Sequence, residues 1–166
     1  MKVLAIDPGN RKSAYCIISA DTLRPLDFDI LPNDQLRNYI RNLKFAEEDI
    51  AVVENLQSYG NLIGRDVLDT AVWIGRFYEC LVRKTAAEPY FIFRMEEKMH
   101  ICKDSRAGDS NIRRALIDRF CDHDFRGGKG TIKNPDWFFG FKADIWAAYA
   151  VGLTLIETKL EGDYPQ

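Results

Sequence analysis

The sequence lacks long apolar runs, and this absence excludes several classes of protein. The longest uninterrupted apolar runs are about four residues, as in Val3 to Ile6, whereas a helix that crosses a bilayer needs roughly 20. An acid at position 7 also interrupts the apolar region that a secretory signal requires. The sequence therefore predicts no membrane span, and we expect a cytoplasmic protein of a bacterial or phage-infected cell.

Cysteine is also scarce. The chain has four cysteines without a C-x-x-C pair: Cys16, Cys80, Cys102 and Cys121. In a cytosolic chain this scatter favours reduced thiols over a disulfide framework. His100 with Cys102, and Cys121 with His123, contain the residue types that bind zinc, but their spacing matches no usual structural zinc motif. We therefore expect the cysteines to be packing residues.

A general excess of positive charge is absent. The net charge is -2 and the pI is about 5.7, while nucleic-acid-binding domains often have a pI above roughly 9. The charge is unevenly distributed, however. Residues 94–142 contain 11 Lys and Arg against 8 Asp and Glu, a net charge of +3, so the remainder carries -5. The basic segment indicates either a phosphate-rich partner or an ordinary solvated surface.

The composition and patterning predict an α/β fold. The 166 residues are 46% hydrophobic and 12% aromatic, which suits a single domain spanning residues 1–166. Apolar runs and alternation predict strands at 2–7, 14–19, 25–31, 50–54 and 90–95. Helical periodicity predicts helices at 34–44, 66–84, 110–120 and 143–159, with a basic connection at 122–141 and a frayed tail at 161–166.

Candidate N-cap residues precede two of these helices. Asn33 and Asp34 stand before the first helix, and Asp109 or Ser110 stands before the third. Each has a short polar side chain that can accept a hydrogen bond from a free N–H group of the first turn. We expect these residues to begin the helices.

Three acids stand at positions where an ionised carboxylate is costly. Asp7 and Glu54 end predicted buried strands, and Asp144 stands near the start of a buried helix. No Lys or Arg is adjacent to Asp7 on its strand, and a carboxylate beside an apolar core needs a positive partner. Mg²⁺ prefers oxygen ligands, so three acids from separate elements predict a site for two metal ions. For any one acid alone, solvation at a strand end or helix capping is the more ordinary role, and it is the three acids together that favour the metal site.

The segments around these acids resemble a known family. Ala5-Ile6-Asp7-Pro8-Gly9-Asn10 resembles the first-strand motif of RuvC-type Holliday junction resolvases, which belong to the RNase H-like nuclease superfamily. Val52-Val53-Glu54-Asn55-Leu56 is similar to that family's fourth strand. The run from Asp144 to Gly152 is similar to its final helix, where an acid precedes a run of small residues. The size would suit a phage or prophage member as well as a cellular one.

The resemblance implies a fold, an activity and a metal site. The fold is a five-stranded mixed sheet, three strands antiparallel and then two parallel, with helices on both faces. The activity is Mg²⁺- or Mn²⁺-dependent nicking of two opposed strands at a four-way DNA junction by a homodimer. Asp7, Glu54 and Asp144 would hold two metal ions in each site and act as the catalytic residues.

The last helix departs from the family pattern. Many members have two acids three residues apart, but Ala147 stands three residues after Asp144. If Asp144 is the second acid, Phe141 stands at the position of the first. One carboxylate is missing in either alignment. Water or a nearby acid, Asp104 or Asp109, is a candidate replacement.

Several residues are candidate DNA contacts. Basic residues near the acids are candidates for binding phosphate, with Lys142 ranked first because it lies two residues before Asp144: Lys142, Lys98, Lys103, Lys129, Lys133 and Arg106. In related resolvases an aromatic residue shortly after the strand-four glutamate inserts at the exchange point. The residue at that spacing is Gln57, so the nearest aromatic candidate is Tyr59.

Two other functions stay open from the sequence. A nuclease with the same fold and metal site could act on flaps or other branched DNA. The acid missing at Ala147 also makes a junction-binding protein without cleavage an alternative. We expect branched DNA to be the partner in each case.

Overall fold

The structure is a computed structural model that describes residues 1–57, 60, 63–122 and 126–160. The described part contains a sheet of five strands in the order β3-β2-β1-β4-β5: β1 (Lys2–Asp7), β2 (Lys12–Ser19), β3 (Pro25–Pro32), β4 (Ile50–Asn55) and β5 (Tyr90–Phe93). β1, β2 and β3 are antiparallel neighbours, while β4 is parallel to β1 and β5 is parallel to β4. This is the predicted RNase H-like mixed sheet, and the prediction is confirmed.

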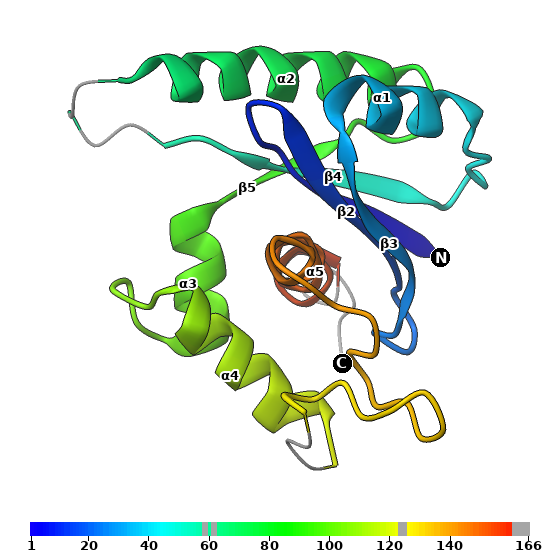
Figure 1. The fold of residues 1–166 in the computed structure, drawn as a ribbon. Coiled ribbons are helices and arrows are strands. Elements are labelled where there is room, and N and C mark those ends of the chain that lie inside the picture. The colour runs from blue at the N-terminus through cyan, green and yellow to red at the C-terminus, as the bar shows by residue number, and fades with distance from the viewer. Residues whose placement is uncertain (58–59, 61–62, 123–125, 161–166) are drawn as a thin grey trace.

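Helices cover both faces of this sheet (Figure 1). α1 (Asn33–Asn42) and α2 (Arg65–Val82) lie on one face, and α5 (Ile145–Leu155) lies on the other, continued by a π-helical turn, η1 (Ile156–Leu160). α3 (Arg94–Cys102) and α4 (Asp109–Phe120) pack beside α5 on its side of the sheet. Within the described ranges, no helix is long and apolar enough to cross a bilayer.

The central strands are apolar on both sides because both faces are covered. In β1, Val3 and Ala5 pack in the core under α5, while Leu4 and Ile6 pack in the core under α1 and α2. β4 follows the same alternation. Strands buried on two faces have continuous apolar runs instead of a polar alternation, which explains the runs at 2–7 and 50–54.

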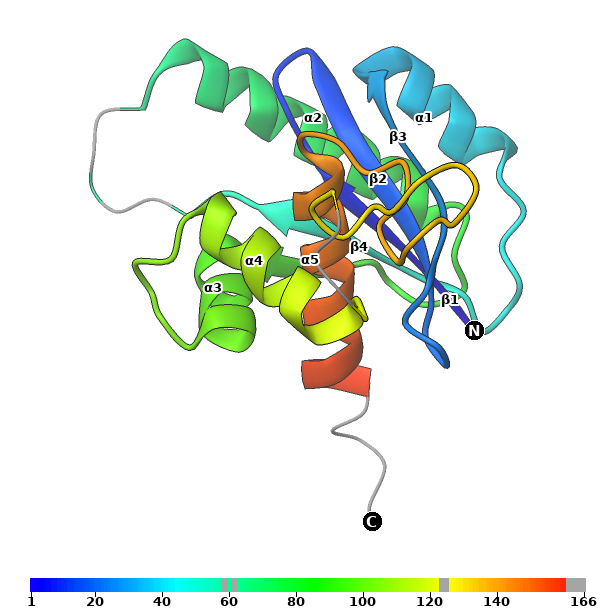
Figure 2. The same ribbon diagram turned by 60° about the horizontal axis from the view of Figure 1, so that its bottom comes forward.

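α5 crosses the sheet at close range over β1 and β2 (Figure 2). A Cβ atom on Gly152 would lie 2.5 Å from Ile18 Cδ1 and 2.9 Å from Ala5 Cβ, so only glycine fits there. The expected small-residue helix is therefore confirmed. It begins at Ile145 and not at 143, because Ala143 has a φ of 37° and Asp144 is the N-cap residue.

The last strand is shorter than predicted, and the helix that follows it was not predicted. β5 ends at Phe93, not at 95, because Arg94 begins α3. The carboxylate of Glu96 accepts a hydrogen bond from the Phe93 N–H at 2.8 Å and so satisfies a free donor of the first turn. Phe93 is not one of the usual N-cap residue types, so no residue at this point signals the start of a helix.

The expected N-caps were also partly wrong. Gly108 precedes α4, so Asp109 is the first helical residue and does not cap the helix. Asn33 likewise lies inside α1, where its buried side chain donates a hydrogen bond to the Gly9 carbonyl at 2.8 Å. Asn33 therefore ties the start of α1 to the turn after β1.

The connection between α4 and α5 contains turns in its described part, as expected for residues 122–141. It is nevertheless anchored by aromatic residues. Phe138 and Phe141 are buried with ring centroids 5.1 Å apart, and both pack against Trp146 of α5. This cluster fixes the start of α5. The tail 161–166 lies outside the described residues.

Candidate functional site

The sheet brings two of the predicted acids together at one edge. Ile6 of β1 pairs in parallel with Val53 of β4, so Asp7 and Glu54, the next residues, leave the sheet at the same end. Both continue the alternation that places Ala5 and Val52 on the α5 side. The two carboxyl groups are close enough that Glu54 adds to the rise in the pKa of Asp7. Two strands distant in sequence therefore form a carboxyl pair facing α5.

Asp144 completes the predicted set from the opposite layer. As the exposed N-cap residue of α5, it lies close enough that its charge raises the pKa of both Asp7 and Glu54. The structure thus brings the three predicted acids into one electrostatic cluster, although they come from β1, β4 and α5.

Burial and mutual repulsion raise the pKa values in this cluster. Burial raises the pKa of Asp7 well above its ordinary value, and the charges of Glu54, Asp144 and Glu97 raise it further. Burial also raises the pKa of Glu54, although the Arg94 guanidinium partly opposes this effect. Carboxyl groups that cannot all ionise in water-poor surroundings are typical of sites that take a cation.

Glu97 is a fourth acid of this cluster that the sequence analysis missed. It lies on α3 with no exposed surface, and its Oε1 accepts a hydrogen bond from Arg94 Nη1 at 2.6 Å. Its other oxygen, Oε2, is buried, and within the described part of the chain it has no hydrogen-bond partner. Burial raises the pKa of Glu97 to about 8, against the opposing effect of Arg94. Glu97 was not a candidate ligand because the helix that carries it, α3, was not predicted.

Arg94 is a cation shared by several of these acids. Its Nη1 binds Glu97 and its Nη2 binds Asp109, the first residue of α4. Asp109 was predicted as an additional ligand or a helix cap; its side chain is 90% exposed and pairs with Arg94. The guanidinium also opposes the rise that burial causes in the pKa of Glu54. Arg94 therefore offsets part of the negative charge of the cluster.

The donor chemistry of the cluster suits a hard divalent cation. Within the described ranges, no three His, Cys, Asp or Glu side chains are arranged to bind one ion as they stand. The donors are nevertheless all carboxylate oxygens, and one of them is buried without a partner. Mg²⁺ and Mn²⁺ take such oxygen ligands, so the residues present fit these ions.

Positions 141, 144 and 147 are the three at which the family pattern would place an acid near the start of α5. Of these three, Asp144 supplies a carboxylate to the cluster. Ala147 lies one turn after Asp144 and is partly buried. Phe141, at the other aligned position, packs against Phe28 with ring centroids 4.6 Å apart. Asp104, one proposed replacement, is half-exposed and pairs with Arg106.

A cleft adjoins the acid cluster at Asp144. Its volume is about 440 Å³, and it is lined by residues of α4 and of the start of α5, including Asp109, Arg113, Arg114 and Trp146. The Arg113 guanidinium lies 4.9 Å from the centre of the Trp146 ring, a cation–π distance. Arg113 and Arg114 were not among the predicted DNA contacts, because those were ranked by distance along the chain from the acids.

The structure distributes the predicted DNA-binding residues over several elements. Lys142 is 65% exposed, and its amine lies 3.7 Å from Asp29 of β3. Lys98 is partly buried on α3, and Lys103 and Arg106 are exposed in the connection to α4. Lys129 and Lys133 lie in the connection to α5. Tyr59 lies outside the described residues.

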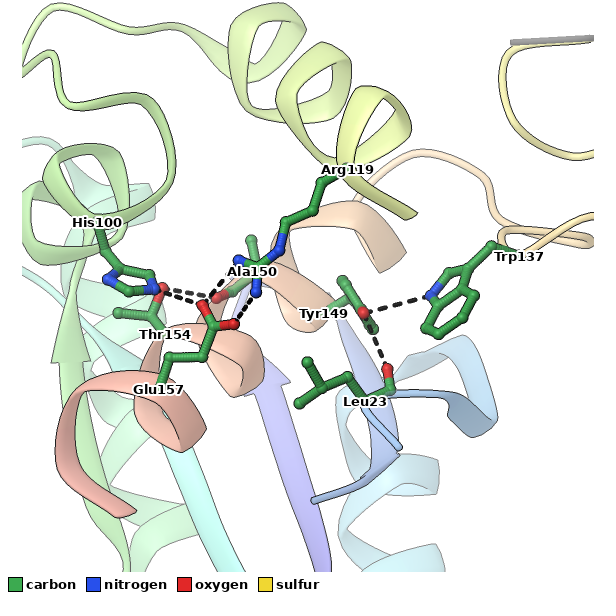
Figure 3. A network of polar contacts seen from close by, with 8 residues as sticks. All are labelled: Leu23, His100, Arg119, Trp137, Tyr149, Ala150, Thr154 and Glu157. Atoms are coloured by element: carbon green, nitrogen blue, oxygen red, sulfur yellow. Dashed lines mark hydrogen bonds and ion pairs between the residues drawn. The ribbon is translucent and has the colours of Figure 1, made fainter. Parts of the chain in front are cut away.

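A second polar cluster joins α3, α4 and η1 (Figure 3). Glu157 of η1 binds His100 Nε2 at 2.6 Å and Arg119 Nη1 at 2.9 Å. Burial alone would raise the pKa of Glu157, but Arg119 and His100 outweigh it and lower the pKa. His100 is thus committed to a carboxylate, and all four cysteines are free thiols, which agrees with the expectation of packing cysteines. His123 lies outside the described residues.

Comparison with known proteins supports the fold. No family model matches the chain, and no curated protein matches its sequence. A Thermus thermophilus RuvC structure is similar over 98% of this chain and 97% of that chain, with a TM-score of 0.65 and 15% identity. T. thermophilus RuvC in complex with a Holliday junction substrate is similar over 97% of this chain and 96% of that chain, with a TM-score of 0.65 and 14% identity. The chain therefore has the RuvC-like fold that its motifs predicted.

Proposed function

We propose that the protein is a metal-dependent, structure-specific endodeoxyribonuclease that resolves four-way DNA junctions by paired nicks. The observation that carries the proposal is the cluster of Asp7, Glu54 and Asp144, which three separate elements bring together in a RuvC-like fold. One solved relative in fold is a RuvC bound to a Holliday junction substrate. The same fold, together with an acidic cluster at one edge of the sheet, supports the same class of substrate.

The carboxylates would hold the metal ions. Asp7, Glu54 and Asp144 would bind Mg²⁺ or Mn²⁺, two ions in each site, and these ions supply Lewis acidity and a hydroxide nucleophile for phosphodiester hydrolysis. The protein's own contribution is to position and orient. The sheet edge fixes Asp7 and Glu54 side by side, and the aromatic cluster around Phe138 fixes the start of α5. A rigid arrangement of ligands is what such sites require.

DNA would approach along the cleft beside Asp144. Arg113 and Arg114 line this cleft and can contact phosphates, which position a duplex without reading its sequence. Basic residues on other elements would extend this contact, with Lys142, two residues before Asp144, ranked first: Lys142, Lys103, Lys98, Lys129, Lys133 and Arg106. Recognition would then depend on the shape of the junction.

We also propose a homodimer, because two opposed strands need two sites. The exposed face of α2 supports this proposal. Leu68 and Val72 are 55% and 52% exposed one turn apart, and a Cβ on Gly75, in the next turn, would meet nothing within 4 Å. An apolar stripe next to a small residue allows two helices to approach closely. The second copy of the chain is therefore the expected occupant of this face.

A nicking assay tests the proposal. The substrates are a mobile four-way junction, a matched duplex, a flap and a single strand, each with Mg²⁺ or Mn²⁺. We expect paired nicks on the junction, with a loss of at least about 10²–10³-fold for Asp7→Asn, a typical cost of removing one key electrostatic group. Asp21→Asn is the matched control, since Asp21 is exposed and pairs with the N-terminal amine.

The other outcomes separate the alternative functions. Cleavage of the flap in preference to the junction would favour a nuclease for other branched DNA. Tight binding of the junction without nicks in either metal would contradict cleavage and leave a junction-binding protein, the function favoured by the absence of an acid at Ala147.

A further inference from the structure

Glu97 presents a buried oxygen that none of the described residues satisfies. The side chain has no exposed surface, Oε1 is bound by Arg94, and Oε2 has no hydrogen-bond partner among the residues that the structure describes. A buried, unpaired carboxylate oxygen costs free energy, and proteins keep such groups where a ligand or ion completes them. Glu97 Oε2 is therefore a buried hydrogen-bond acceptor to which no described residue donates.

The unsatisfied oxygen belongs to the acid cluster. The charge of Glu97 acts on Asp7, and the charge of Glu54 acts on Glu97. Arg94 faces this group from the first turn of α3, and its guanidinium is shared with Asp109. One guanidinium shared among these carboxylates leaves the cluster with an excess of negative charge, which a divalent cation would neutralise.

Glu97 adds a carboxylate to a cluster in which the family pattern loses one. Ala147 offers no ligand, and Phe141 is buried in the aromatic cluster. Among positions 141, 144 and 147, the carboxylate thus comes from Asp144. A further acid of the same cluster, Glu97, comes from α3. With Glu97 included, the cluster again contains four carboxylates.

We propose that Glu97 is a metal-ligating residue of this site and supplies from α3 the carboxylate that α5 lacks. The inference rests on the proposed function, because it concerns the same metal site. Arg94 holds Glu97 through Oε1 and leaves Oε2 for the ion.

The position of α3 suits a ligand-bearing helix. Glu96 fixes its first turn through the Phe93 N–H, and His100 fixes its last turn to Glu157, which Arg119 of α4 also binds (Figure 3). Both ends of the helix are thus attached to neighbouring elements. A ligand between two fixed ends is preorganised for an ion.

Metal binding without DNA tests the inference. Calorimetric titration of the full chain with Mn²⁺ is compared for the wild type, Asp7→Asn, Glu97→Gln and Glu96→Gln. We expect Glu97→Gln to weaken Mn²⁺ binding at least about tenfold, the scale on which metal sites respond to loss of a supporting group. Glu96→Gln is the matched control, because it removes a negative charge from the same helix but keeps a side-chain oxygen that can accept the Phe93 N–H and so hold the first turn; we expect it to keep wild-type affinity.

Two further variants keep the test decisive. Glu97→Asp retains the negative charge but shortens the side chain, so it serves if Glu97→Gln folds poorly, and we expect the same direction of change. In the double variant Glu97→Gln, Ala147→Asp, recovery of Mn²⁺ affinity supports a ligand role, since an acid on α5 would not restore a contact with Arg94.

The failure of this inference differs from the failure of the proposed function. If the wild type binds Mn²⁺ in an Asp7-dependent manner and Glu97→Gln binds equally well, Glu97 is a structural partner of Arg94 and the inference is wrong. If the wild type neither binds Mn²⁺ nor nicks the junction, the proposed metal-dependent function is overturned, and the inference with it.

Discussion

Glu97 and Glu157 are two well-buried carboxylates on the α5 side of the sheet, and their surroundings differ. Glu157 is 9% exposed and binds both His100 and Arg119, which lower its pKa. Glu97 is fully buried, lies near Glu54 and Asp7, and keeps one oxygen without a partner while its pKa is raised. The carboxylate that joins helices, Glu157, is thus paired with cationic side chains. In the cluster where we propose a metal site, the carboxylates outnumber the cations.

Metal addition is expected to give the largest difference between the two clusters. Mg²⁺ or Mn²⁺ at about 100 times its Kd would stabilise the folded protein by about 2.7 kcal/mol, since the ion binds only the folded state. Thermal unfolding with metal and with EDTA measures this shift. Asp7→Asn should abolish it, and Glu157→Gln should keep it. An equal shift in Asp7→Asn would place the ion elsewhere.

Glu157→Gln is expected to lower stability by about 1–2 kcal/mol. The variant weakens charge-assisted hydrogen bonds to His100 and Arg119. The loss of stability is small because Arg119 is half-exposed and solvent screens its interaction with the carboxylate. Urea unfolding in EDTA measures the loss. Glu88→Gln is a surface control, because Glu88 binds the exposed Tyr78 hydroxyl. A loss no larger than that of the control would mean that the network contributes little.

The smallest expected effect is the dependence of the Glu157 contribution on pH. Because its pKa is lowered in the folded protein, the stabilisation is present above the ordinary glutamate pKa of about 4.3. It is lost as the pH falls through the folded pKa, where Glu157 becomes protonated. The difference in unfolding free energy between the wild type and Glu157→Gln should therefore shrink between pH 6 and pH 3. A difference that is constant over this range would contradict the assignment to the charged form.

Local patterns predicted those parts of the fold that have local causes. Apolar runs predicted the central strands, and small residues predicted α5, since burial on two faces and close packing leave a mark in consecutive residues. α3 left no such mark, because it begins after Phe93 and the Glu96 carboxylate satisfies the Phe93 N–H. Helix starts without a usual cap residue are not visible in a sequence read alone.

The sequence by itself determined the central strands, the three acids at element ends and their resemblance to a nuclease family. Each of these depends on residues adjacent in the chain. Only the tertiary structure decided that Glu97 and Arg94 join those acids, and that Arg113 and Arg114 line the cleft beside Asp144. The physical reason is that electrostatic energy depends on distances in space, and here those distances are set by packing between helices far apart in sequence.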